Sequence, residues 1–154
     1  MSTTTSARSA RDDLRGVAGL ADGLRPAVMR LARRLRQVRA EGFELTASQL
    51  SALGTLARAD DQPIGALAAA EKVAAPSMTR IVNALQEQGL VTRTPDPADR
   101  RQSLVGLTPG GRDLLLLLRR RRSEWLAQRI AELDATEKDV LRRAVGIFER
   151  ISDQ

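Results

Sequence analysis

The chain has 154 residues, 42% apolar and only 2% aromatic, so it can bury one core made mainly of aliphatic side chains. Its 25 Lys and Arg residues exceed its 19 Asp and Glu residues, and the resulting formal charge of +6 favours a polyanionic partner such as nucleic acid. The sequence has no Cys, His or Tyr, which removes thiol chemistry, thiolate or imidazole metal sites and the usual general bases, so we expect neither an enzyme nor a cofactor or metal site.

The first segment, residues 1–13, reads MSTTTSARSARDD and lacks the apolar block of a signal peptide. Its polar composition predicts a disordered N-terminal arm. Elsewhere no apolar run exceeds five residues, which is too short to cross a bilayer. We therefore expect a soluble protein of the cytoplasm.

A long amphipathic helix is predicted from Leu14 to about Ala40. Pro26 lacks a backbone donor, so we expect it to kink or restart this helix. The arginines of the polar side fit a solvated basic face or contacts with DNA or a ligand. The apolar residues recur three or four positions apart, as one helical stripe does: Leu20, Leu24, Val28, Leu31, Leu35 and Val38.

Two shorter helices are predicted next. Thr46 and Gln49 have the spacing of a capping box, which predicts a helix from Ala47 to about Arg58. A turn that ends at Pro63 leads into a third helix, since proline suits a first helical turn.

The stretch from Ala75 to Gly89 is predicted to be the second helix of a helix-turn-helix. Gly89 can adopt the left-handed backbone conformation that ends a helix. The helical period turns four apolar residues inward: Met78, Ile81, Val82 and Leu85. It turns outward polar residues that can touch DNA bases: Ser77, Thr79, Arg80, Asn83 and Gln86.

A β-hairpin is predicted after this helix, with strands over Leu90 to Thr94 and Gln102 to Leu107. Its tip carries Arg100 and Arg101, whose guanidinium groups can reach a minor groove and phosphates. Asp99 is placed to orient a neighbouring arginine through a charge-assisted hydrogen bond. We interpret the helix and the hairpin as a recognition helix followed by a wing.

Two further helices are predicted to complete the chain. Thr108, followed by proline, is an N-cap signature for a helix that runs to about Leu133. Its five successive leucines, residues 114–118, cover every side of the helix and imply burial against two surfaces. Thr136 is predicted to cap a last helix, whose apolar stripe from Val140 to Ile151 is followed by nothing that could cover it. We therefore expect the terminal helices of two chains to pack together in a homodimer.

The chain resembles the MarR family of bacterial winged helix-turn-helix regulators over residues 77–111, SMTRIVNALQEQGLVTRTPDPADRRQSLVGLTPGG. This segment is similar to that family's recognition helix, Gly-Leu-Val exit, Asp-x-Arg wing and Leu-Thr-x-x-Gly entry to the next helix. The resemblance implies a mostly α fold with a small β-hairpin, in one domain over residues 14–154. Within it, a winged helix-turn-helix over about 47–107 would lie between dimerisation helices over about 14–40 and 112–152.

The resemblance also implies a function, that of a homodimeric transcription regulator, usually a repressor, which leaves a pseudo-palindromic operator when a small, often aromatic, ligand binds. It assigns major-groove contacts to Ser77, Thr79, Arg80 and Asn83 and a wing pair to Asp99 and Arg101. By chemistry alone, Arg80 suits a guanine edge and Asn83 an adenine edge. The complete DNA-binding set that we predict is Pro76, Ser77, Thr79, Arg80, Asn83, Arg93, Asp99, Arg100 and Arg101.

Another class of function fits the same surface. Winged helices also serve as docking domains, and the basic face would then bind an acidic protein partner. An enzymatic role has little support, because no pair of a nucleophile and an activating base is visible.

Overall fold

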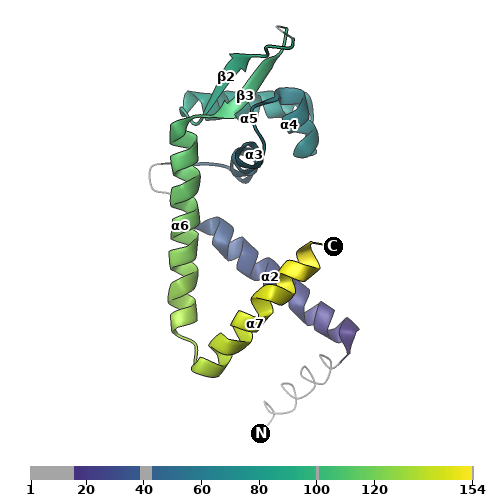
Figure 1. Ribbon diagram of the computed structural model, residues 1–154, viewed down its shortest axis with the longest axis vertical. Coiled ribbons are helices and arrows are strands. Elements are labelled where there is room, and N and C mark those ends of the chain that lie inside the picture. Colours follow the sequence, from purple (N-terminus) through teal and green to yellow (C-terminus); the bar gives the residue numbers. More distant parts are fainter. Residues whose placement is uncertain (1–15, 39–42, 100, 154) are drawn as a thin grey trace. The chain divides into compact units, whose positions relative to one another are not determined.

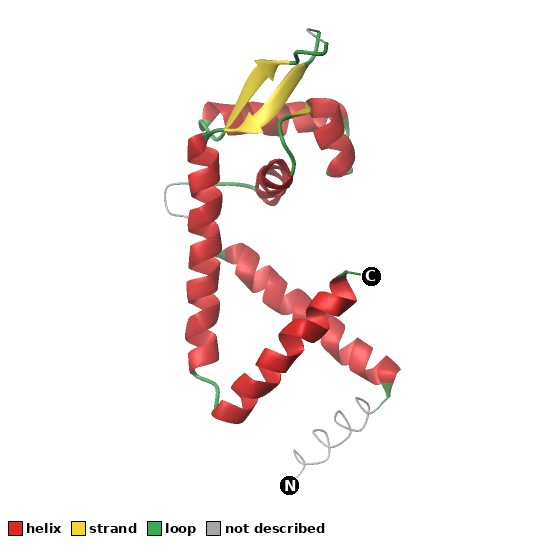
Figure 2. Ribbon diagram, viewed as in Figure 1, coloured by secondary structure: helices red, strands yellow, loops and turns green. Residues whose placement is uncertain are grey.

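The computed structural model describes residues 16–38, 43–99 and 101–153. The predicted N-terminal arm and Arg100 lie outside the described residues. Contacts divide the chain into two compact units, Met1–Val38 and Arg39–Gln154. Figures 1 and 2 show the helices and strands of each unit.

The described part of the first unit is the helix α2, Val17–Gln37. It is one continuous helix that contains Pro26, so the proline does not restart it. Among the described residues of α2 none is buried, and Leu20 and Met29 are 54% and 61% exposed. The predicted amphipathic helix is therefore present, between slightly narrower bounds.

The second unit begins with three helices, α3 (Ala47–Arg58), α4 (Ile64–Ala70) and α5 (Ala75–Glu87). The predicted capping box starts α3, because the Gln49 backbone N–H donates to Thr46 Oγ1 and the Thr46 N–H donates to Gln49 Oε1. The Thr55 hydroxyl then links α3 to the end of α4 through a 2.5 Å hydrogen bond to Glu71 Oε1.

Among the described residues, Lys72 in the turn of the helix-turn-helix and Gly89 at its end have positive φ. Lys72, with φ of 55°, turns the chain between α4 and α5, although a non-glycine residue seldom adopts this conformation. Gly89, with φ of 69°, ends α5 as predicted. The N–H of the next residue, Leu90, donates to the Leu85 carbonyl and closes the helix end.

A three-stranded antiparallel sheet follows, in the order β1-β3-β2. The predicted hairpin is β2 (Val91–Pro95) and β3 (Ser103–Leu107), which pair along their whole length. The third strand, β1 (Gln62–Pro63), pairs with the other edge of β3 and was not expected from the sequence. The wing is thereby tied to the segment that enters α4.

Aliphatic residues of the helix-turn-helix and the sheet form the core. Met78, Val82 and Leu85 of α5 are completely buried, as predicted, and Ile81 packs against them while partly exposed. The other members of the core come from the surrounding elements: Ala52, Leu53, Leu56, Leu67, Ala68, Leu90, Val91, Val105, Leu107, Leu114 and Leu118. This packing turns the polar face of α5 outward.

The helix α6 (Pro109–Ala131) begins at its predicted N-cap, Thr108. Its five leucines differ in environment, because Leu114 and Leu118 are 3% exposed whereas Leu116 and Leu117 are 60% and 38% exposed. Within the described residues, only one side of the leucine run therefore lies in the core.

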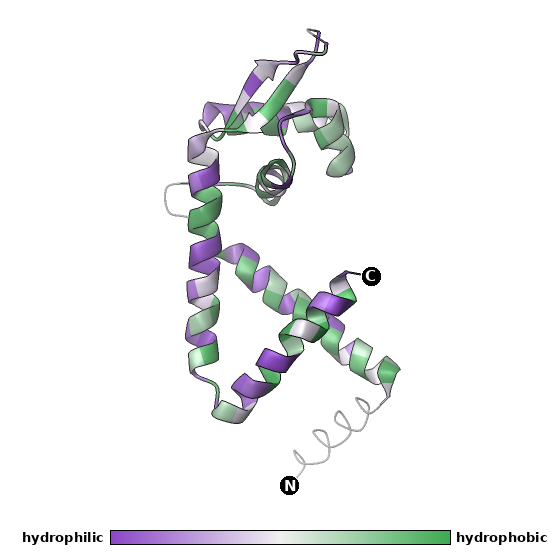
Figure 3. Cartoon of the chain, viewed as in Figure 1, coloured by the Kyte–Doolittle hydropathy of each residue, from purple (hydrophilic) through white to green (hydrophobic). Residues whose placement is uncertain are grey.

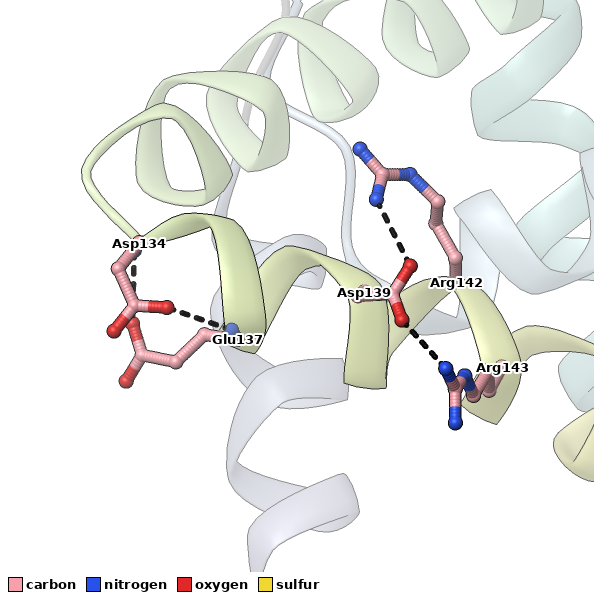
Figure 4. Close-up of polar contacts among 5 residues, drawn as sticks. All are labelled: Asp134, Glu137, Asp139, Arg142 and Arg143. Atoms are coloured by element: carbon pink, nitrogen blue, oxygen red, sulfur yellow. Dashed lines mark hydrogen bonds and ion pairs between the residues drawn. The ribbon is translucent and has the colours of Figure 1, made fainter.

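The last helix, α7 (Ala135–Ser152), corrects one prediction, since Asp134 rather than Thr136 is its N-cap. Asp134 Oδ1 accepts from the Glu137 N–H and Glu137 Oε2 accepts from the Asp134 N–H, which makes a capping box (Figure 4). Asp139 pairs with Arg142 and Arg143 on the polar side of α7 (Figure 4).

Apolar and polar residues alternate along α7 (Figure 3). None of its described residues is buried, and Val140, Ile147 and Ile151 are 61%, 46% and 60% exposed. No described helix is long and apolar enough to cross a membrane.

Candidate nucleic-acid interface

The outward face of α5 carries the predicted base-contacting residues. Ser77, Thr79, Arg80 and Asn83 are all exposed, while Met78 between them is buried. The Thr79 hydroxyl donates a 3.0 Å hydrogen bond to the Ala75 carbonyl, which leaves its oxygen free to act as an acceptor. A single helix face thus presents a hydroxyl group, a guanidinium group and a carboxamide.

The first turn of α5 begins without a capping side chain. Its N-cap is Ala74, whose methyl group cannot accept a hydrogen bond from the first backbone amides. The turn contains no acidic residue, and Pro76 lies exposed within it. No side chain therefore caps this end of α5, where the Ser77 and Met78 N–H groups donate to the Ala74 carbonyl.

Arg93 on β2 joins the wing to α5. Its Nη2 donates a 2.6 Å hydrogen bond to Oδ1 of Asn83. Arg93 is half-buried, and its Nε is shielded from solvent with no acceptor among the described residues. Two residues that the sequence predicts as separate DNA contacts are thus one hydrogen-bonded pair.

The wing tip is ordered by Asp99. Its Oδ1 accepts from the Arg101 backbone N–H at 3.0 Å, and its Oδ2 accepts from Gln102 Nε2 at 3.1 Å. The backbone hydrogen bond from Arg101, followed by the bond from Gln102, lowers the pKa of the Asp99 carboxyl. Asp99 therefore holds the loop, and the side chain of Arg101 lies exposed beside it.

The predicted site residues fall into two groups on one unit. Pro76, Ser77, Thr79, Arg80 and Asn83 lie on α5, and Arg93, Asp99 and Arg101 belong to the wing, with the pair Arg93 and Asn83 joining the groups. Sequence reasoning missed Gln102 as a partner of Asp99. The available signal was the spacing of three residues between Asp99 and Gln102, which lets both side chains lie in the same turn.

A groove of about 900 Å³ lies between α3 and α6. Leu50, Leu115 and Leu116 contribute its apolar lining, and Arg112, Arg119 and Arg122 contribute positive charge. The Nε of Arg122 is buried and meets no acceptor among the described residues. Asp60 and Asp61 also line the groove, beside Arg58, so that its arginines outnumber its carboxylates four to two. The groove is large enough for a small molecule and offers guanidinium donors to an acidic one.

Comparison with known sequences gives matches that cover the site. The model of the MarR family matches residues 45–103, which include α3 to the start of β3. An HTH-type transcriptional regulator from Mycobacterium tuberculosis (strain CDC 1551 / Oshkosh) is 45% identical over 137 residues, covering 89% of this chain and 95% of that protein.

Solved structures share the fold. A protein from Pseudomonas aeruginosa PA01 matches with a TM-score of 0.76 and 34% identity, over 88% of this chain and 94% of that chain. A variant of MepR from S. aureus, bound to an oligodeoxyribonucleotide, matches with a TM-score of 0.67 and 20% identity, over 87% of this chain and 96% of that chain.

Proposed function

This chain belongs to the MarR family of transcriptional regulators, and we propose that it reads a pseudo-palindromic operator as a homodimer and represses transcription from it. The observation that carries this proposal is the exposed polar face of α5 beside a basic wing. Met78, Val82 and Leu85 on the opposite face of α5 are buried in the core. In this role α5 enters the major groove, which is wide enough to admit a helix and distinguishes all four base pairs.

The wing supplies the second part of the proposed interface. The exposed Arg101, next to the loop that Asp99 holds, reaches the minor groove or its phosphates. Arg100 shares this role in the proposal. The overall charge of +6 adds an attraction to DNA that does not depend on sequence. The oligodeoxyribonucleotide bound to the MepR variant is consistent with this use of the fold.

Exposed apolar residues on α2 and α7 support the homodimer. Leu20, Val28 and Leu31 on α2 are 54%, 43% and 44% exposed, and Val140 and Ile151 on α7 are 61% and 60% exposed. Apolar stripes of this kind are usually covered by another surface. A second copy that covers them would set two α5 helices about 34 Å apart, one turn of DNA, so that they read an inverted repeat.

A small acidic ligand, for example an aromatic carboxylate, is the effector that we propose for the groove between α3 and α6. Its apolar lining suits a ring, and the guanidinium of Arg122 suits a carboxylate. Such a ligand would release DNA by favouring one spacing of the two α5 helices over the other. A thermal-shift screen of aromatic carboxylates against the parent and Arg122→Met tests it, with stabilisation of the parent alone expected.

The decisive experiment is a binding titration of the purified protein with the DNA upstream of its own gene, at low and moderate salt. We expect a retarded complex that Arg80→Ala weakens about 10-fold. Arg120→Ala is the matched control, because it removes the same charge from an exposed ion pair with Glu124 on α6. Repression is supported if a reporter gene behind the operator is transcribed more strongly when the protein is absent. A regulator of transcription acts where the bacterial DNA lies, so we propose a cytoplasmic location.

The same titration tests the docking function, which the basic surface also permits. A protein that retards no duplex even at low salt is not the regulator proposed here, and capture of an acidic protein partner then becomes the better explanation of the charge. If Arg80→Ala and Arg120→Ala weakened DNA binding equally, the net positive charge of the protein, and not the α5 face, would account for the binding.

A further inference from the structure

We propose that Arg93 is a positioning residue that holds the Asn83 carboxamide with its amino group outward, so that this pair selects guanine rather than adenine at the base that it meets. The inference rests on the proposed DNA-binding function and deepens it. It also replaces the adenine preference that the chemistry of an isolated asparagine suggests.

The orientation of the carboxamide follows from the chemistry of its partner. A guanidinium group only donates hydrogen bonds, so the Asn83 atom that lies 2.6 Å from Arg93 Nη2 is the oxygen, Oδ1. The amino group, Nδ2, is the other branch of the planar carboxamide and points away from Arg93. Because Asn83 is exposed on the outward face of α5, this amino group is the atom available to a base.

Arg93 is fixed well enough to act on its partner. It lies in the middle of β2, where it pairs in register with Val105 of β3, whose side chain is completely buried. The side chain of Arg93 is half-buried, and its Nε has no access to solvent. The guanidinium of Arg93 is thereby held in place beside Asn83 Oδ1.

The edges of the two purines respond differently to such a pair. Guanine presents two acceptors in the major groove, O6 and N7, whereas adenine presents the acceptor N7 and the donor amino group at N6. An asparagine that reads adenine must accept from N6. Asn83 Oδ1 already accepts from Arg93 with one lone pair, and the positive charge of Arg93 disfavours a second donor at the other lone pair. We therefore expect guanine to be favoured on the order of 10-fold over adenine at this base.

The test is selection of bound duplexes from a randomised pool by the full-length protein, followed by competition titrations. Asn83→Ala identifies the base position, because preference there alone should disappear. The parent should select guanine at that position. Arg93→Met removes the positioning donor and leaves a similar apolar stem, so the carboxamide can turn and accept adenine about as well as guanine.

Three further variants separate positioning from charge or folding. Arg93→Lys retains a donor and should retain guanine. Asn83→Asp keeps the oxygen that faces Arg93 but turns the outward donor into an acceptor, so the preferred base should change from guanine to cytosine, which offers an amino group. Arg101→Ala, which removes a wing charge, should lower affinity without changing the base.

Two results would overturn the inference. One is that the parent selects adenine at the position that Asn83→Ala identifies. The other is that Arg93→Met, shown to be folded by its thermal melt, binds all duplexes more weakly to the same degree and still prefers guanine. That result is the behaviour of a phosphate contact. If the parent selects no sequence, the proposed function fails and this inference fails with it. If Arg93→Met does not fold, the base selected by Asn83→Asp tests the inference instead: cytosine supports it and any other base contradicts it.

Discussion

The Thr108 hydroxyl donates a 2.6 Å hydrogen bond to the carbonyl oxygen of Gly89, and so joins the entry of α6 to the exit of α5. The same hydroxyl oxygen accepts from the Gly111 N–H at 3.0 Å, and the Thr108 N–H donates to the Leu90 carbonyl at 3.1 Å. The wing therefore leaves and returns to the body of the second unit at one hydrogen-bonded point. Through this point the end of the proposed recognition helix is coupled to α6.

Thr108→Val should lower the free energy of unfolding by about 1–2 kcal/mol, because it keeps the shape of the side chain but loses both hydroxyl hydrogen bonds. Urea denaturation measures the change. Thr108→Ser retains the hydroxyl and should cost less than half as much. A serine variant as unstable as the valine variant would show that the methyl group, and not the hydroxyl, is what matters.

Gly111→Ala should destabilise the protein by roughly 1–3 kcal/mol, because an added Cβ would collide with the carbonyl oxygen of Leu90. Gly110→Ala is the matched control, since a Cβ there meets its nearest neighbours at 3.7 Å and alanine favours a helix. Chemical denaturation of the two variants should separate them clearly. Equal stabilities would mean that α6 moves away from Leu90 without cost.

The Asp99 carboxyl should titrate below its ordinary pKa of 3.8, because it accepts hydrogen bonds from the Arg101 backbone and from Gln102. A pKa lowered by folding means that the carboxylate stabilises the wing above the ordinary value, and that this contribution is lost as the pH falls through the lowered pKa. Carboxyl chemical shifts followed by NMR measure the titration. Gln102→Ala should raise the pKa towards 3.8, and an unchanged pKa would remove the side-chain bond from the explanation.

Arg101→Ala should weaken binding to every duplex and reduce the slope of log affinity against log salt by up to about one unit. The reason is that one phosphate or minor-groove contact and its released counterion are lost. Anisotropy titrations at several salt concentrations measure the slope. Arg120→Ala, in the exposed ion pair with Glu124, should leave it unchanged. A slope that Arg101→Ala does not alter would exclude this side chain from the interface.

Ile147→Glu should convert the proposed dimer into a monomer, because it places a charge in the apolar stripe of α7, where Ile147 is 46% exposed in the single chain. Light scattering coupled to size-exclusion chromatography gives the mass. Arg142→Glu is the control, because Arg142 lies on the opposite side of the helix and pairs with Asp139. A parent protein that is monomeric at micromolar concentration would contradict the proposal directly.

The helices could be predicted well from local sequence, because their ends depend on residues three or four positions apart. Thr46 with Gln49 and Thr108 before its proline give the starts of α3 and α6 correctly. The helix α7 begins before the predicted cap Thr136, because Asp134 and Glu137 form a capping box with the same local spacing.

Features that join distant parts of the chain depended on the folded structure. The strand β1 forms only because β3 offers it an edge, and two residues carry no period by themselves. The exposed and buried leucines of α6 are distinguished by which side the core contacts. The bond between Arg93 and Asn83 depends on how the wing packs against α5, which neither residue's local sequence specifies. Sequence periodicity therefore indicates the polar face of α5, whereas the partner that orients Asn83 is set by tertiary packing.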